Sequence, residues 1–240
     1  MKKSGTDIFR FKEFHVSHHR SSMKVGVDGV LIGAWGAVES GRGIDVGTGC
    51  GLIALMAAQR NESCHVDAID IDRASVEEAA VNFEESGWGK RLKAIHADIW
   101  KYAEDHKETY EFILSNPPYF HAGVTPESRR EKARHLGSLS PAALLEIGGM
   151  MLKVEGKLSM IFPYEDLERL EEEAVAFGLS VEKICAVADK PGKSPKRAMI
   201  MARKGARAED PEMERLDIRN ETGEYSQEYK RLTSEFYLDI

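Results

Sequence analysis

Residues 42–51 read Arg42-Gly43-Ile44-Asp45-Val46-Gly47-Thr48-Gly49-Cys50-Gly51, a short apolar strand that leads into a loop of alternating glycines. The next segment, Leu52 to Arg60, has apolar side chains at Leu52, Leu55 and Met56. That spacing predicts a helix. A strand, a glycine loop and a helix in this order are typical of a domain that binds a nucleotide or a nucleotide-like cofactor.

The glycine spacing indicates which kind of cofactor the loop accepts. Leu52 occupies the position where the dinucleotide fingerprint requires a third glycine. Asp45 precedes the first glycine by two residues, where a carboxylate suits an ammonium, directly or through water, better than a pyrophosphate. S-adenosylmethionine carries an ammonium and a sulfonium but no phosphate, and glycines let the backbone approach it closely. We therefore predict S-adenosylmethionine as the cofactor, bound by Asp45, Gly47, Gly49 and Gly51.

Three further predicted strands each end at a polar side chain. Strands are expected at 66–71, 91–95 and 110–114, and helices at 74–85 and 99–104. This alternation implies a parallel sheet, so Asp70, Asp98 and Asn116 should meet Asp45 at one sheet edge. Asp70 can accept both ribose hydroxyls of the cofactor. Asp98 can accept from the adenine amine, or it caps the helix that follows it.

The order of elements defines the expected fold class. We predict a single α/β domain over residues 1–240, with a doubly wound, mostly parallel, seven-stranded Rossmann-like sheet and an antiparallel terminal strand. Segments 181–188 and 197–202 are expected to pair antiparallel and close the sheet, and no element is expected at 208–218.

The first 40 residues, approximately, are expected to form an N-terminal extension. Within it, residues 23–35 indicate a glycine-rich turn followed by a short helix, with Asp28 as its cap. The free N-terminus of such a helix can hold an anionic group. We include Asp28 among the candidate cofactor contacts. A capped helix that only packs against the domain is the alternative.

The strand at 110–114 is followed by Asn116-Pro117-Pro118-Tyr119. Prolines end the strand and fix the loop without an ordering cost at binding. The Asn116 amide oxygen and the Pro117 carbonyl are two acceptors that can take both N–H bonds of a flat exocyclic amine. Tyr119 can stack on the ring that carries this amine. We therefore predict Asn116, Pro117 and Tyr119 as catalytic residues, the alternative being a turn with a half-buried aromatic.

Composition excludes several classes of protein. The chain of 240 residues is 42% hydrophobic and 30% charged, with a net charge of −7, which is ordinary for a soluble globular protein. No apolar run reaches the roughly 18 residues of a membrane span, and no signal peptide is read. The 3 cysteines are isolated, which favours reduced thiols in the cytoplasm. His15, His18 and His19 lack a second cluster at ligand spacing, so no metal site is predicted.

Basic residues are concentrated in segment 190–207, which holds seven Lys or Arg and no acid, and in segment 129–134. Both are candidate contacts for a tRNA backbone. A flexible hairpin loop and a solvated helix face are the respective alternatives. Residues 9–24 interleave aromatic and basic side chains, which suits either base stacking or an edge strand with one buried face.

As a whole, the glycine loop and the Asn-Pro-Pro-Tyr loop resemble those of class I S-adenosylmethionine-dependent methyltransferases that act on exocyclic amines or amides. Segments 11–14, 23–35 and 235–238 are similar to the tRNA1(Val) adenine-37 N6-methyltransferase family of bacteria, and the resemblance covers nearly the full length. It implies N6-methylation of an adenine beside the anticodon of valine tRNA.

Other functions remain open at this point. A protein glutamine N5-methyltransferase or an rRNA base-amine methyltransferase would use the same loop. An NAD(P)-linked oxidoreductase is disfavoured by Leu52 and Asp45, and a binding module without activity is disfavoured by the intact Asn-Pro-Pro-Tyr loop.

Overall fold

The computed structural model describes residues 8–21, 24–118, 139–205 and 210–240. Its centre is an eight-stranded sheet with the strand order β10-β8-β9-β7-β6-β3-β4-β5. All neighbouring strands are parallel, except that β9 is antiparallel to both β7 and β8. The strands are β3 (Gly41–Val46), β4 (Cys64–Asp70), β5 (Leu92–His96), β6 (Tyr110–Ser115), β7 (Leu152–Pro163), β8 (Leu179–Ala188), β9 (Arg197–Lys204) and β10 (Glu212–Asp217).

The predicted α/β fold with a doubly wound, mostly parallel sheet is confirmed, and two details are corrected. The eighth strand is β10, which pairs with β8 in a region where the sequence predicts no element. Its acidic residues have distant partners, since Glu214 lies 2.6 Å from Lys183 Nζ and accepts from Trp35 Nε1. The antiparallel strand β9 lies inside the sheet, between β8 and β7. It is antiparallel to β8 because the short connection 189–196 permits a hairpin but no parallel crossover.

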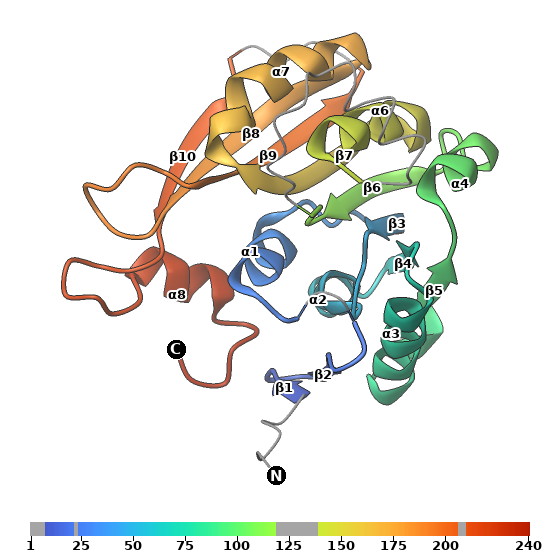
Figure 1. Cartoon of the computed structure of the whole chain (residues 1–240), viewed down its shortest axis with the longest axis horizontal. Coiled ribbons are helices and arrows are strands. Elements are labelled where there is room, and N and C mark those ends of the chain that lie inside the picture. Colours follow the sequence, from blue (N-terminus) through green and yellow to red (C-terminus); the bar gives the residue numbers. More distant parts are fainter. Residues whose placement is uncertain (1–7, 22–23, 119–138, 206–209) are drawn as a thin grey trace.

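Helices cover both faces of the sheet (Figure 1). One face carries α1 (Val27–Trp35), α2 (Leu52–Arg60), α3 (Arg73–Glu85) and α8 (Gln227–Thr233); the other carries α4 (Ile99–Asp105), α6 (Pro141–Met151) and α7 (Leu167–Ala176). Short 3-10 helices at Gly89–Arg91 and Tyr164–Asp166 precede β5 and α7. Each face has its own hydrophobic cluster. The central strands are therefore buried on both sides and have near-continuous apolar sequences.

Small residues bring α1 close to α2. A Cβ atom at Gly33 would lie 2.5 Å from the Met56 sulfur, and one at Gly29 would lie 3.2 Å from a Leu52 methyl carbon. Neither position leaves free space for a side chain. The first turn of α1 is thereby held beside the start of α2, where the glycine loop ends.

The aromatic residues near the N-terminus belong to the core. β1 (Ile8–Arg10) and β2 (His15–Ser17) form a two-stranded antiparallel sheet. Phe11 stacks on Phe14 at 4.6 Å and on Tyr237 at 5.9 Å, and Lys12 N donates to the Phe236 carbonyl at 2.8 Å. Phe11 and Phe14 are buried, so the interpretation of these two rings as a base-stacking surface is wrong. Residues 8–17 thus join the segment after α8 to the body of the molecule.

Candidate cofactor and substrate site

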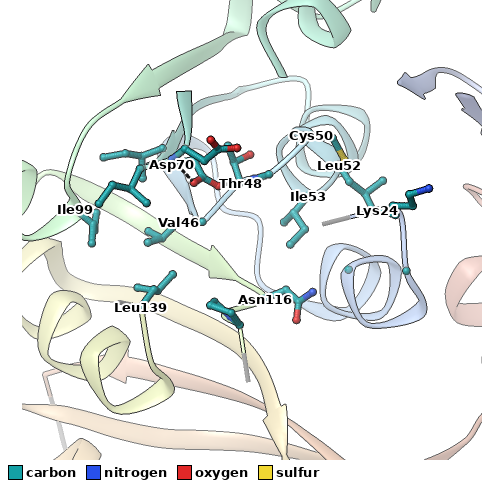
Figure 2. Close-up of a pocket in the computed structure, with 18 of the residues that line it drawn as sticks. Lys24, Val46, Thr48, Cys50, Leu52, Ile53, Asp70, Ile99, Asn116 and Leu139 are labelled. Carbon is teal, nitrogen blue, oxygen red and sulfur yellow. Dashed lines mark hydrogen bonds between the residues drawn. The ribbon is translucent and has the colours of Figure 1, made fainter. Parts of the chain in front are cut away.

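A cavity of about 340 Å³ lies at the carboxyl ends of β3, β4 and β6 (Figure 2). The strand order reverses here, because β3 has β4 on one side and β6 on the other, and such a crevice is the usual ligand site of an open α/β sheet. The lining residues are Lys24, Gly26, Gly29, Val46, Gly47, Thr48, Gly49, Cys50, Leu52, Ile53, Ile69, Asp70, Ile71, Asp72, Ala97, Ile99, Asn116, Pro118 and Leu139.

The glycine loop needs glycine for its conformation. Gly47, Gly49 and Gly51 have φ values of +73°, +55° and +86°, a left-handed region that other residues avoid. The Gly47 and Thr48 amides donate to the Ile69 carbonyl at 2.9 and 3.0 Å, which fixes the loop against the end of β4. A Cβ atom at Gly51 would lie 2.5 Å from the Phe83 ring. Gly47 and Gly49 line the cavity, whereas Gly51 is the N-cap residue of α2.

Asp70 lies at the end of β4 and faces the cavity. Its Oδ2 accepts from the Gly49 amide and its Oδ1 from the Asp72 amide, both at 2.9 Å. The two backbone donors fix the carboxylate and leave each oxygen with further acceptor capacity. Asp72 instead caps α3, accepting from the Ala74 and Ser75 amides.

Asp45 is fully buried behind the loop and is not one of the described residues that line the cavity. Its Oδ2 accepts from the Thr48 hydroxyl at 2.6 Å and from the Ala54 amide at 3.2 Å, while Oδ1 has no hydrogen-bond partner within the described chain. Burial raises the pKa of this carboxyl to about 7, against the lowering effect of the two hydrogen bonds. The geometry directly supports a role of Asp45 in fixing the glycine loop, through its hydrogen bond with Thr48.

Two other predicted acids have structural partners. Asp98 caps α4 by accepting from the Trp100 amide at 2.9 Å, which is the alternative role that the sequence leaves open. The prediction that Asp28 caps α1 is wrong, because the helix begins after Gly26 without a side-chain cap and Asp28 lies in its first turn. Its Oδ1 is 2.5 Å from Nε of Arg197, the first residue of β9. Neither acid is among the described cavity-lining residues.

The segment after β6 reaches the cavity from the side opposite Asp70 (Figure 2). Asn116 and Pro118 line the cavity and are half-buried, and Pro117 is buried. The Ser115 hydroxyl donates to the Val46 carbonyl at 2.7 Å, which holds the end of β6 against the end of β3. Tyr119 and the segment 129–134 lie outside the described residues.

The structure therefore brings Gly47, Gly49, Asp70 and Asn116 together around one cavity, with Asp45 behind it. Local motif reasoning does not identify Thr48 or the apolar wall, which comprises Ile71, Ala97, Ile99 and Leu139. A usable signal for Thr48 is its position three residues after Asp45, within the loop. Ile71, Ala97 and Ile99 follow the ends of β4 and β5, beside the predicted acids, whereas Leu139 precedes α6.

This fold and cavity define a methyltransferase. Residues 29–168 match the model of the methyltransferase small domain family. A predicted O-methyltransferase from Agrobacterium tumefaciens is similar in structure, with a TM-score of 0.65 and 18% identity over 87% of this chain and 96% of that one. TYW2 of M. jannaschii in complex with AdoMet gives a TM-score of 0.59 and 13% identity, covering 84% of this chain and 87% of that one.

Sequence relatives narrow the class. A protein of Tolumonas auensis is 39% identical over 98% of both chains, and one of Bacteroides fragilis is 40% identical over 97% of this chain and 98% of its own. A protein of Yersinia enterocolitica is 37% identical over 96% of this chain and 92% of its own. Each is named tRNA1(Val) (adenine(37)-N6)-methyltransferase. The chain belongs to this family, as the resemblance of its motifs predicts. No helix in the described ranges is long and apolar enough to cross a membrane.

Proposed function

We propose that this protein transfers a methyl group from S-adenosylmethionine to N6 of an adenine in tRNA, namely adenine 37 of tRNA1(Val). The observation that carries the proposal is that Asn116 faces the same cavity as the glycine loop and Asp70. The names of the full-length relatives support the choice of substrate. The predicted cytoplasmic location belongs to the same proposal, since the substrate is a tRNA.

The residues around the cavity fit the proposed cofactor. A volume of about 340 Å³ is within the usual range for a small-molecule site. The Asp70 carboxylate offers acceptors for ribose hydroxyls, and the apolar wall suits a flat purine ring. Asp45 stays a predicted contact of the ammonium; it lies fully buried behind the loop, and its Oδ1 has no hydrogen-bond partner within the described chain. When bound, S-adenosylmethionine supplies an electrophilic methyl group. Asp98 and Gly51 stay predicted contacts of this cofactor.

The chain's own residues position the acceptor amine. Asn116 Oδ1 and the Pro117 carbonyl accept the two N–H bonds of the adenine amine and orient its lone pair toward the methyl group. The two prolines keep this corner rigid, so orientation supplies most of the rate enhancement. Chemistry on a base requires the base to leave its stack, and Tyr119 is proposed to stack on it. The N6 proton passes to water after methyl transfer.

The RNA backbone is proposed to contact the start of segment 190–207. Lys190, Lys193 and Lys196 are exposed on the turn between β8 and β9, at the same sheet edge as Asn116. The later basic residues of this segment are less available: Arg203 pairs with Glu155 and Glu182, and Lys204 pairs with Glu108. Segment 129–134 stays a predicted contact.

The decisive experiment incubates the purified chain with labelled S-adenosylmethionine and tRNA that lacks the modification, followed by nucleoside analysis. We expect labelled N6-methyladenosine at position 37 of tRNA1(Val). A protein with accessible glutamine side chains is the matched alternative substrate, because a glutamine amide offers the same planar NH₂ group. Label in the protein and none in the tRNA would reject the proposal.

A variant links the geometry to the cofactor. Asp70→Asn keeps one acceptor for the loop amides but weakens the pair of acceptors for the ribose. We expect the Michaelis constant for S-adenosylmethionine to increase while kcat changes little. A loss confined to kcat would contradict ribose binding at Asp70.

A further inference from the structure

The first turn of α1, which forms part of the cavity wall, is joined to the sheet by an ion pair. Lys24, Gly26 and Gly29 line the cavity, so the first turn of α1 and the residues before it shape the site. This helix has no side-chain cap at its N-terminus. The Asp28 carboxylate, in that turn, lies 2.5 Å from the Arg197 guanidinium, and the Asp28 side chain is only 19% exposed.

The Arg197 backbone is held firmly on the other side of this contact. As the first residue of β9, it pairs with Pro163 of β7 and Val187 of β8. The residue before it, Lys196, donates its amide to the Val187 carbonyl at 2.9 Å and accepts from the Tyr164 amide at 3.1 Å. The Arg197 backbone is therefore fixed in the sheet, and its guanidinium can hold the Asp28 carboxylate in place.

We infer that Asp28 and Arg197 are a positioning pair, which keeps the first turn of α1 at the distance that the cofactor requires. Asp28 acts through Arg197 and not by touching the cofactor. The inference rests on the proposed function, since it concerns the proposed S-adenosylmethionine site. Two roles are thereby distinguished for Asp28, namely direct contact with the cofactor and support of the first turn of α1.

The two roles predict different effects of substitution. If Asp28 contacted the cofactor directly, losing Arg197 would leave that contact in place, and the losses of the two residues would add. In a positioning pair, either loss removes the same interaction, so the double variant is no worse than the single variants. A partly buried ion pair contributes about 1 kcal/mol, which corresponds to a roughly fivefold change in a dissociation constant.

The test measures S-adenosylhomocysteine binding by calorimetry for the wild type, Asp28→Asn, Arg197→Gln and the double variant. We expect the dissociation constant to increase about fivefold in each single variant, and again only about fivefold in the double variant. Arg197→Lys should restore part of the affinity because it keeps the charge. At saturating cofactor, kcat should stay near the wild-type value while the Michaelis constant increases.

The control is Arg203→Gln, at the other end of the same strand. Arg203 pairs with two carboxylates, those of Glu155 and Glu182, which lie at the edge of the sheet remote from the cavity. The Arg203→Gln substitution should lower the free energy of unfolding about as much as Arg197→Gln does, without changing cofactor affinity. Unchanged affinity in Arg197→Gln, or additive losses in the double variant, would overturn the inference. If the wild type binds no S-adenosylhomocysteine, the proposed function fails instead.

Discussion

The buried Asp45 carboxyl makes the stability of this protein depend on pH. Its side chain is fully buried, and burial raises its pKa from the ordinary 3.8 to about 7. Replacement by Asn keeps the shape and an acceptor for the Thr48 hydroxyl and the Ala54 amide, but it removes the ionisation. Comparing Asp45→Asn with the wild type therefore isolates the free energy of burying this charge.

The sign and size of the effect follow from the two pKa values. Between its unfolded and folded pKa, the group holds more protons in the folded state, so the stability of the wild type falls as pH rises. Each unit of pKa difference corresponds to about 1.4 kcal/mol, which gives roughly 4 kcal/mol in total. About 3 kcal/mol of this loss falls between pH 5 and pH 8. The Asn variant lacks this pH-dependent contribution to the free energy of unfolding.

Urea unfolding of both proteins at pH 5 and pH 8, without cofactor, measures this term. The free energy of unfolding of Asp45→Asn minus that of the wild type should increase by about 3 kcal/mol from pH 5 to pH 8. Contributions from all other titrating groups cancel in that difference. A difference that does not change with pH would show that the carboxyl ionises in the folded state as it does in water, and the reasoning would be refuted.

Three further predictions concern the site and the fold. Asn116→Ala should lower kcat by roughly 100-fold or more with cofactor affinity nearly unchanged, measured by tRNA methylation and by calorimetry, because one acceptor for the amine is lost; normal methylation would contradict the role. Replacing the exposed lysines of Lys190–Lys196 by Gln should weaken tRNA binding and reduce its salt dependence by about two to three units of log–log slope, with cofactor binding as the control; an unchanged slope would place the RNA elsewhere. Gly33→Ala should destabilise the fold by about 1–3 kcal/mol in urea unfolding, because its Cβ atom would meet the sulfur of a methionine on α2. The control is Gly87→Ala, whose Cβ atom would meet nothing within 4 Å, and equal effects of the two substitutions would contradict the steric argument.

Elements that depend on local signals could be predicted closely from the sequence. α2 spans Leu52–Arg60 as predicted, because Gly51 ends the loop in a left-handed conformation with a φ of +86°. α6 begins at Pro141, because the Ser140 hydroxyl accepts from the Ala143 amide. The alternation of strands and helices was enough to predict that Asp70 and Asn116 approach the same cavity.

Features that depend on distant partners could not be predicted in this way. Asp28 looks like a helix cap in the sequence, and only the fold brings Arg197 beside it. The sequence of β10 looks like an acidic loop. The segment forms a strand beside β8, where Lys183 neutralises Glu214. Asp45 looks like a cavity-facing acid in the sequence, and only the packed loop shows that it is buried and bonded to Thr48 and Ala54.

The aromatic cluster of Phe11, Phe14 and Tyr237 has a consequence for synthesis of the chain. Phe11 and Phe14 leave the ribosome early, but Phe11 meets Tyr237, and the Lys12 amide meets the Phe236 carbonyl, only after almost all of the chain has been translated. Until then the hairpin of β1 and β2 has only its partners from earlier in the chain, such as Trp88 beside Phe14, and lacks those at the C-terminus. We expect protease to cleave a stalled nascent chain that stops at residue 230 faster within residues 8–17 than it cleaves the finished protein there.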